Sequence, residues 1–237
     1  MQKTFQTAFC IALKGSLMLS GKGVNPEFQE KANLVKKLND LINSLSQMDP
    51  QDIHRRVGVE ISRDSGNLVF FKLPFFNQLL TVNYPEFHIY DAISGKPLGL
   101  FQKVLIMHYL SHSDGFPLSG NWIAFSELPS GNFYAQAYEG YTGKQLLNYF
   151  GNNSDNFANA CEIIGGYQDS LGQYSYAFDV LPNVRLLAAC WLGDEDFPTS
   201  YKILFDRSIV HHMTTDGCAI LGSMLAQKII SKARSLE

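Results

Sequence analysis

The chain is poor in charged residues and lacks the features that would place it on nucleic acid or in a membrane. Asp, Glu, Lys and Arg make up 17% of its 237 residues, against roughly 25% in an average soluble domain. The formal net charge is −3, so there is no excess of basic residues to neutralise phosphates. The longest run without a charged residue, 73–85, has thirteen residues, whereas a membrane-spanning helix needs about 20 apolar residues. We therefore expect neither nucleic acid nor a membrane among its partners.

The four cysteines show none of the spacings of a metal-binding motif. Cys10, Cys161, Cys190 and Cys218 lie far apart, and no two of them form the C-x-x-C pattern of a zinc ribbon or an iron–sulfur cluster. Each lies among apolar residues, which is typical of buried thiols that behave as small hydrophobes. Reduced cysteines favour a cytoplasmic location.

Common catalytic and nucleotide-binding motifs are missing too. The glycines fit neither G-x-G-x-x-G nor the phosphate-binding P-loop, and no G-x-S-x-G sequence indicates a serine hydrolase. The apolar stretch Phe5–Leu19 contains Lys14 and Gly15, which a secretory signal tolerates poorly. We expect this stretch to pack as a first helix or strand.

Hydrophobic periodicity in the N-terminal half predicts both helices and strands. Apolar residues at helical spacing predict an amphipathic helix over 26–47 and a second helix over Leu100–Ser113. Between them, residues 58–91 have β character, and Asp64-Ser65-Gly66 is a hairpin-like turn signal. These residues predict a small antiparallel meander, with Pro74 and Pro85 interrupting its strands.

The C-terminal half continues with short helices, strands and a long final helix. Helices are predicted over 143–150 and 155–164, strands over 174–180, 184–192 and 201–205, and a last helix from a Thr215 cap to about Ala233. The sequence therefore predicts an α+β fold, in which an antiparallel meander and hairpin strands pack with several helices in a single domain, 1–237. One alternative separates residues 1–95 as an N-terminal subdomain.

Six short segments, spread in order over residues 100–225, form a recognisable set. They read MHYL (107–110), GNWIAFSELPSG (120–131), FG (150–151), LPNV (181–184), WLGDEDFP (191–198) and ILFDRS (203–208). On these segments the chain resembles an uncharacterised family, a domain of unknown function from anaerobic bacteria and archaea. The family's common form has Phe-Pro where this chain has Leu181-Pro182.

The resemblance implies a biological setting rather than a mechanism. Some relatives carry an added iron–sulfur domain of a type also found in corrinoid proteins of one-carbon metabolism. The resemblance therefore implies a tetrapyrrole or metal cofactor, and an iron–sulfur or corrinoid protein as a partner. It transfers no catalytic residue to this chain.

Two histidines are the first candidates for a site. His108 and His112 stand four residues apart on the predicted second helix, in line with Phe101 and Leu105. This spacing aims both imidazoles at the interior, where they could bind a metal together or one could ligate the iron or cobalt of a tetrapyrrole. The ordinary alternative is a pair of buried, hydrogen-bonded histidines. Our leading hypothesis is a non-catalytic binding or accessory protein for haem, a corrinoid or a metal cofactor, with His108 as the axial donor.

The aromatic residues of the segment 120–131 are candidates for the wall of the same site. Trp122 and Phe125 would supply a flat apolar surface for a ring. The segment could equally be a capped helix between two turns. If the aromatic residues instead cover a subunit interface, the protein is a partner-binding scaffold.

A second set of candidates is acidic. Asp194 and Asp196 follow a predicted strand, Asp206 ends the next strand, and His211 comes shortly after it. Carboxylate oxygens with a histidine could hold a divalent metal, which would suit a metal-dependent hydrolase or lyase. The alternative is an acidic turn in water, with Asp206 capping the turn that follows it.

Overall fold

The computed structural model describes residues 26–236, and its first element is α2 (Pro26–Leu45). The predicted helix over 26–47 is thereby confirmed. Leu38 and Leu45 are buried against the neighbouring helix, while Lys36 and Lys37 are exposed. The predictions for Phe5–Leu19 and Cys10 lie outside the described residues.

The first sheet is the predicted antiparallel meander. Its strands, which lie in the order β1-β2-β3-β4, are β1 (Glu60–Arg63), β2 (Val69–Phe75), β3 (Gln78–Tyr84) and β4 (Ile89–Asp91). The Asp64 carboxylate accepts hydrogen bonds from the backbone N–H groups of Gly66 and Leu68, which fixes the turn between β1 and β2. Pro74 does not interrupt β2 as expected. β1 pairs with β2 only as far as Lys72, so at Pro74 the β1 side of β2 is an unpaired edge. Proline lacks an N–H group and is tolerated at such an edge.

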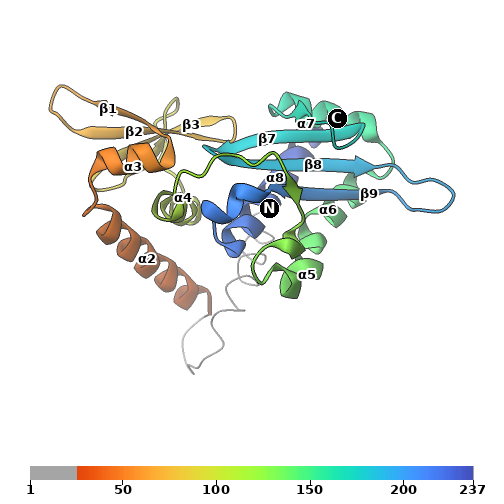
Figure 1. Cartoon of the computed structure of the whole chain (residues 1–237), viewed down its shortest axis with the longest axis horizontal. Coiled ribbons are helices and arrows are strands. Elements are labelled where there is room, and N and C mark those ends of the chain that lie inside the picture. Colours follow the sequence, from red (N-terminus) through yellow and green to blue (C-terminus); the bar gives the residue numbers. More distant parts are fainter. Residues whose placement is uncertain (1–25, 237) are drawn as a thin grey trace.

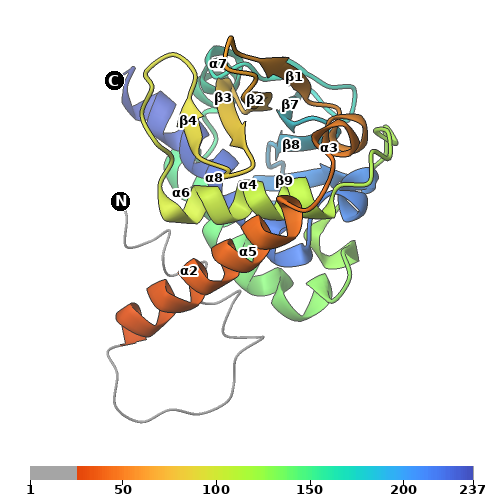
Figure 2. The same ribbon diagram turned by 90° about the vertical axis from the view of Figure 1, so that its left-hand side faces the viewer.

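Two helices pack beside this sheet (Figure 1). They are α3 (Pro50–Val57) and α4 (Leu100–His112), and the latter confirms the second predicted helix. Arg56 of α3 donates hydrogen bonds to the carbonyl oxygens of Leu110, Ser111 and Ser113, at 3.0, 3.1 and 2.9 Å. These carbonyls end α4 without partners in the helix, so the guanidinium caps α4 from another element. α2 packs on α4 and extends away from the sheets (Figure 2).

The second sheet is larger and has the order β5-β9-β8-β7-β6, with all neighbours antiparallel. Its strands are β5 (Trp122–Ile123), β6 (Tyr167–Gln168), β7 (Tyr174–Leu181), β8 (Val184–Trp191) and β9 (Ser200–Asp206). β8 is the central strand, as its apolar sequence predicts. β7 differs from the expected half-buried strand, because Ser175 and Ala177 on its outer face are buried too.

Helices cover one face of the second sheet (Figure 1). The helical segments are η1 (Phe125–Glu127), η2 (Gly131–Tyr134), α5 (Ala135–Tyr141), α6 (Gly143–Phe150), α7 (Ser154–Ile163), η3 (Arg207–His211) and α8 (Thr215–Arg234). Thirteen of the twenty residues of α8 are buried, because it contacts α5, α6, α7 and the strands β8 and β9. Its cap is Thr214, one residue before the predicted Thr215: the Thr214 hydroxyl accepts a hydrogen bond from the Gly217 N–H.

The two sheets share one hydrophobic core, and the fold is a single α+β domain. Buried residues of both sheets and of α3, α4 and α8 belong to one contiguous cluster. The Phe76 N–H donates to the Val180 carbonyl at 2.8 Å, and the Tyr109 hydroxyl donates to the Pro182 carbonyl at 2.7 Å. The first bond joins the turn after β2 to β7, and the second joins α4 to the turn after β7. Among the described residues, no helix combines the length and the apolar character that crossing a bilayer requires.

Candidate functional site

His108 lies in α4 beside a small cavity between three helices. Its ring is half-buried, and its Nε2 atom is fully buried with no hydrogen-bond partner in the described part of the chain. The cavity has a volume of about 30 Å³ and is also lined by Lys37 of α2 and by Thr214 and Asp216 at the start of α8. Burial, assisted by the positive charges of Lys37 and His112, lowers the pKa of His108 to about 4. The imidazole is therefore neutral at physiological pH.

The volume of the cavity limits what can lie beside His108. A cavity of 30 Å³ holds one or two water molecules, far less than a porphyrin or corrin ring occupies. His108 is thus a neutral imidazole beside a cavity of solvent size.

The expectation that both imidazoles face the interior is wrong for His112. The side chain of His112, the last residue of α4, is exposed. Residues 104–107 are all buried, so α4 is surrounded on most of its circumference rather than along one stripe. Burial along the line of Leu105, His108 and His112 decreases toward the end of the helix, from buried to half-buried to exposed. The two histidines therefore do not face one common site.

The predicted aromatic wall is also divided between two faces. Phe125 is buried in the main core and stacks on Tyr138, with ring centroids 4.2 Å apart and an interplanar angle of 9°. Trp122 lies on the outer face of the second sheet, packs against the buried cluster that contains Ala177 and Leu187, and donates from Nε1 to the Asp169 carboxylate at 3.2 Å. The two rings therefore do not line a common surface.

The four predicted metal ligands are not brought together in one place. Asp194 and Asp196 lie in the exposed loop between β8 and β9, where the Asp194 carboxylate accepts from the N–H groups of Asp196 and Phe197. Asp206 lies at the other end of β9, a strand roughly 20 Å long. Within residues 26–236, no three His, Cys, Asp or Glu side chains are grouped in a way that would hold a metal ion.

Asp206 is a structural carboxylate rather than a free ligand. It is buried and accepts hydrogen bonds from the backbone N–H groups and hydroxyls of Ser119 and Ser208 and from the Gly120 N–H. Burial alone would raise its pKa, but the hydrogen bonds from Ser208 and Ser119 outweigh that effect and lower it. Asp206 therefore ties the segment before β5 to the start of η3, as the capping alternative predicted.

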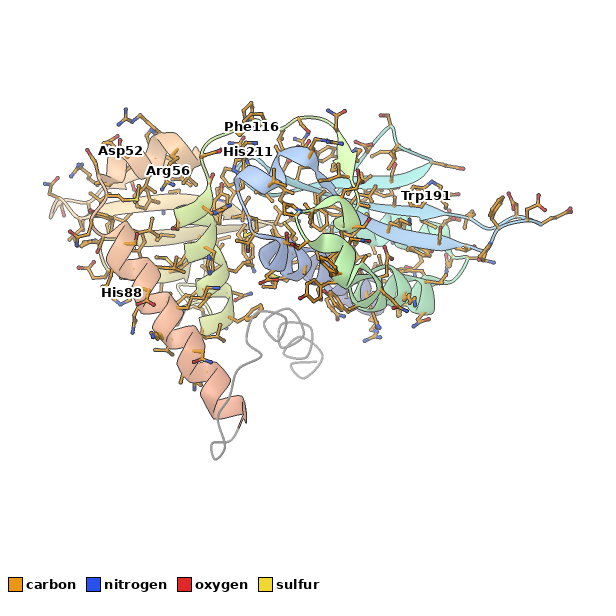
Figure 3. The ribbon with its side chains drawn as sticks, turned by 60° about the horizontal axis from the view of Figure 1, so that its bottom comes forward. Asp52, Arg56, His88, Phe116, Trp191 and His211 are labelled. Atoms are coloured by element: carbon orange, nitrogen blue, oxygen red, sulfur yellow. The ribbon has the colours of Figure 1, made fainter. Side chains whose placement is uncertain are left out.

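The adjacent histidines after β9 have different surroundings. His211 pairs with Asp114 at 2.8 Å and stacks on Phe116 with centroids 4.1 Å apart. Figure 3 shows Phe116 and His211 next to each other and away from Trp191. His212 is fully buried: the Ser113 hydroxyl donates to its Nδ1 at 2.8 Å, and its Nε2 donates to the Phe116 carbonyl at 2.9 Å. Burial lowers the pKa of His212, so both bonds fit a neutral ring that fastens the 113–116 segment to η3.

A ligand-sized hollow lies elsewhere, where α8 ends. This groove has a volume of about 520 Å³, within the range of small-molecule sites. Three separate segments form it: the turn between β2 and β3, the end of α7, and the last turns of α8. Its lining residues are Phe76, Asn77, Gln78, Ile163, Ile164, Gln227, Lys228, Ser231, Lys232 and Ser235.

The groove combines an apolar wall with two cations and no acid. Phe76, Ile163 and Ile164 supply the wall, and Lys228 and Lys232 are the charged residues of the lining. The Lys228 ammonium lies 5.0 Å from the centre of the Phe76 ring, and burial lowers its pKa. Among the described residues neither lysine has an ion-pair partner. The partial negative charge at the end of α8, about half a unit, is smaller than the charge of the two ammonium groups.

Sequence reasoning did not find this groove. Lys228 and Lys232 suit the negative end of a helix dipole, which is an ordinary reason for lysines at that position. Asn77 and Gln78 occupy a hairpin turn, where amide side chains are common. These residues come together only in the folded chain. The sequence contains no local pattern that predicts their proximity.

The described structure thus defines an α+β protein with a basic, ligand-sized groove. A family model described as a domain of unknown function, DUF3786, matches residues 49–228, well over half of the chain, and the protein belongs to that family. The match includes the first sheet as well as the segments that carry the resemblance. No curated protein and no solved structure matches the chain.

Proposed function

We propose that this protein is a non-enzymatic binding or accessory protein whose groove holds a small molecule with an apolar body and carboxylate or phosphate groups. The carrying observation is the groove of about 520 Å³, with Lys228 and Lys232 beside an apolar wall and without an acidic residue. Unpaired ammonium groups at the edge of an apolar surface attract anionic oxygens, and the isoleucines and Phe76 accept the body of the ligand.

Within this class we propose a tetrapyrrole, since a haem presents a flat apolar ring and two propionates. A corrinoid, with its phosphate, is the second candidate. We propose that the ring lies in the groove, held by Lys228 and Lys232, and that His108 is not its axial ligand, because the cavity beside His108 has a volume of only about 30 Å³. The buried thiols of Cys161, Cys190 and Cys218 support a reduced, cytoplasmic setting. On the family resemblance alone, we also propose an anaerobic host and an iron–sulfur or corrinoid protein as partner.

The test is a titration of the purified protein with haem and, separately, with cobalamin, followed by the change in visible absorption. Saturable binding of haem is expected, and K228M and K232M should each weaken it about tenfold, the size expected for one charge-assisted hydrogen bond. K202M is the matched control, because Lys202 is an exposed lysine of β9 outside the groove. Haem dimethyl ester, which lacks the free carboxylates, should bind weakly to every variant.

H108A separates the groove from the axial-histidine hypothesis. Because His108 is not among the groove residues, this variant should keep the haem affinity of the wild type. Absence of saturable binding of both ligands contradicts the proposal. So does an affinity that is lost in H108A but unchanged when both groove lysines are replaced.

A further inference from the structure

The hairpin of β8 and β9 projects beyond the helices that cover the second sheet (Figure 1). We call residues 191–198 the hairpin tip, and every one of them is exposed. Three large apolar side chains lie within it: Trp191 is 39% exposed, Leu192 44% and Phe197 72%. Such side chains are common singly on a surface, but three within seven residues on a projecting loop are typical of a contact site.

The tip is held in one conformation by its own hydrogen bonds. The Gly193 N–H donates to the Thr199 hydroxyl at 2.8 Å, and the Asp194 N–H donates to the Phe197 carbonyl at 2.9 Å. The Thr199 hydroxyl in turn donates to the Asn152 side chain at 2.6 Å, which anchors the base of the hairpin. A Cβ on Gly193 would lie 2.6 Å from the Thr199 nitrogen, so the loop closes tightly there. A preformed loop loses little conformational entropy when it binds.

Three consecutive carboxylates accompany the apolar side chains. Asp194, Glu195 and Asp196 are exposed, and residues 186–201 contain no lysine or arginine. Hydrogen bonds from the N–H groups of Phe197 and Asp196 lower the pKa of Asp194, so this carboxylate is ionised at neutral pH. No ion pair involving the tip occurs among the described residues. The tip therefore presents unpaired negative charge beside aromatic surface.

We propose that the hairpin tip is a docking element for another protein, one that presents lysines and arginines around an apolar pocket for Phe197 and Trp191. Charge complementarity selects a basic partner and steers its approach, and large aromatic side chains are the usual anchors of such interfaces. A second copy of this chain is not the occupant. Each copy has a net charge of −3 and carries the same three tip carboxylates, so two copies lack the basic residues that complement the tip and repel each other there.

The probe is a synthetic amphipathic helix with leucines on one face and lysines at its edges, compared with the same peptide in which glutamate replaces lysine. W122F leaves Trp191 as the single tryptophan of the chain, so its fluorescence reports on the tip. The basic peptide should shift the emission to the blue with saturation, and the acidic peptide should not. Raising the salt concentration should weaken the binding.

Matched variants locate the contact. In the W122F background, F197S and the triple change D194N/E195Q/D196N should each weaken peptide binding at least tenfold. F133S, at an aromatic side chain that is 84% exposed elsewhere, and D40N/E60Q/E86Q, which removes three exposed carboxylates elsewhere, should not change it. The proposal is overturned if the basic peptide fails to bind, if the control variants weaken binding as much as the tip variants, or if sedimentation shows self-association through the tip instead.

Discussion

At the scale of single residues, His212 shows how a buried polar side chain organises its surroundings. Its ring bonds Ser113 on one side and the Phe116 carbonyl on the other. H212A should lower the free energy of unfolding by about 3 kcal/mol, because it leaves a cavity and two buried groups without partners. Urea denaturation followed by circular dichroism measures the change.

The matched control for this substitution is H88A, because His88 is exposed (Figure 3). It should change the free energy of unfolding by less than about 0.5 kcal/mol. Equal effects of H88A and H212A would show that the buried hydrogen bonds of His212 contribute nothing measurable.

His108 gives a pH dependence of known sign. Its pKa in the folded protein is about 4, below the ordinary 6.5, so the unfolded chain takes up the proton first as the pH falls. The neutral ring therefore contributes stability that is complete above about pH 6.5 and is lost progressively down to about pH 4. In H108L the free energy of unfolding should fall less steeply over this range. Parallel curves for H108L and the wild type would contradict the assignment.

At the scale of elements, two helical glycines differ in the space around them. A Cβ on Gly222 of α8 would lie 2.2 Å from the Tyr138 hydroxyl, whereas one on Gly140 of α5 would meet nothing within 4 Å. G222A should therefore destabilise the protein by about 1–3 kcal/mol through overpacking. G140A should stabilise it by roughly 0.5–1 kcal/mol, because alanine favours the helix.

Thermal unfolding of the two glycine variants gives the test directly, since the expected shifts in melting temperature have opposite signs. A stabilising G222A would mean that Tyr138 moves away at no cost, and that α5 and α8 are less closely packed than the structure indicates.

The elements themselves were largely predictable because their signals are local. The apolar spacing in α2, the turn at Asp64 and the apolar sequence of β8 each depend on neighbouring residues, and these predictions are confirmed. The errors arise where distant parts of the chain intervene. Pro74 is accommodated because β1 is short, and the burial of Ala177 depends on Trp122 and Leu204 from other strands.

At the scale of the whole molecule, the shared core predicts one cooperative unfolding transition. Both sheets contribute to a single buried cluster and are joined by the hydrogen bond from Phe76 to Val180. Native-state hydrogen exchange should give the slowest amides of β2 and β3 the same free energy of opening as those of β8 and β9. A consistently lower value in β2 and β3 would make the N-terminal sheet a separate unfolding unit.

The candidate site belongs to this scale as well, which explains why the sequence did not predict it. Residues 76–78, 163–164 and 227–235 are separated by long stretches of chain, and each stretch has an ordinary local role. The histidine hypothesis relied on the spacing within one helix. Spacing correctly predicted that the His108 ring points inward, since the ring is half-buried, but spacing carries no information about the volume left beside the ring.

The burial of α8 has a consequence for how the chain is made. This helix is packed against three others and against β8 and β9, yet it follows every strand in the chain. During translation the two sheets emerge from the ribosome before the element that covers them. The native core therefore closes only after residue 234 has left the exit tunnel, and until then the nascent chain exposes apolar surface that a chaperone would bind.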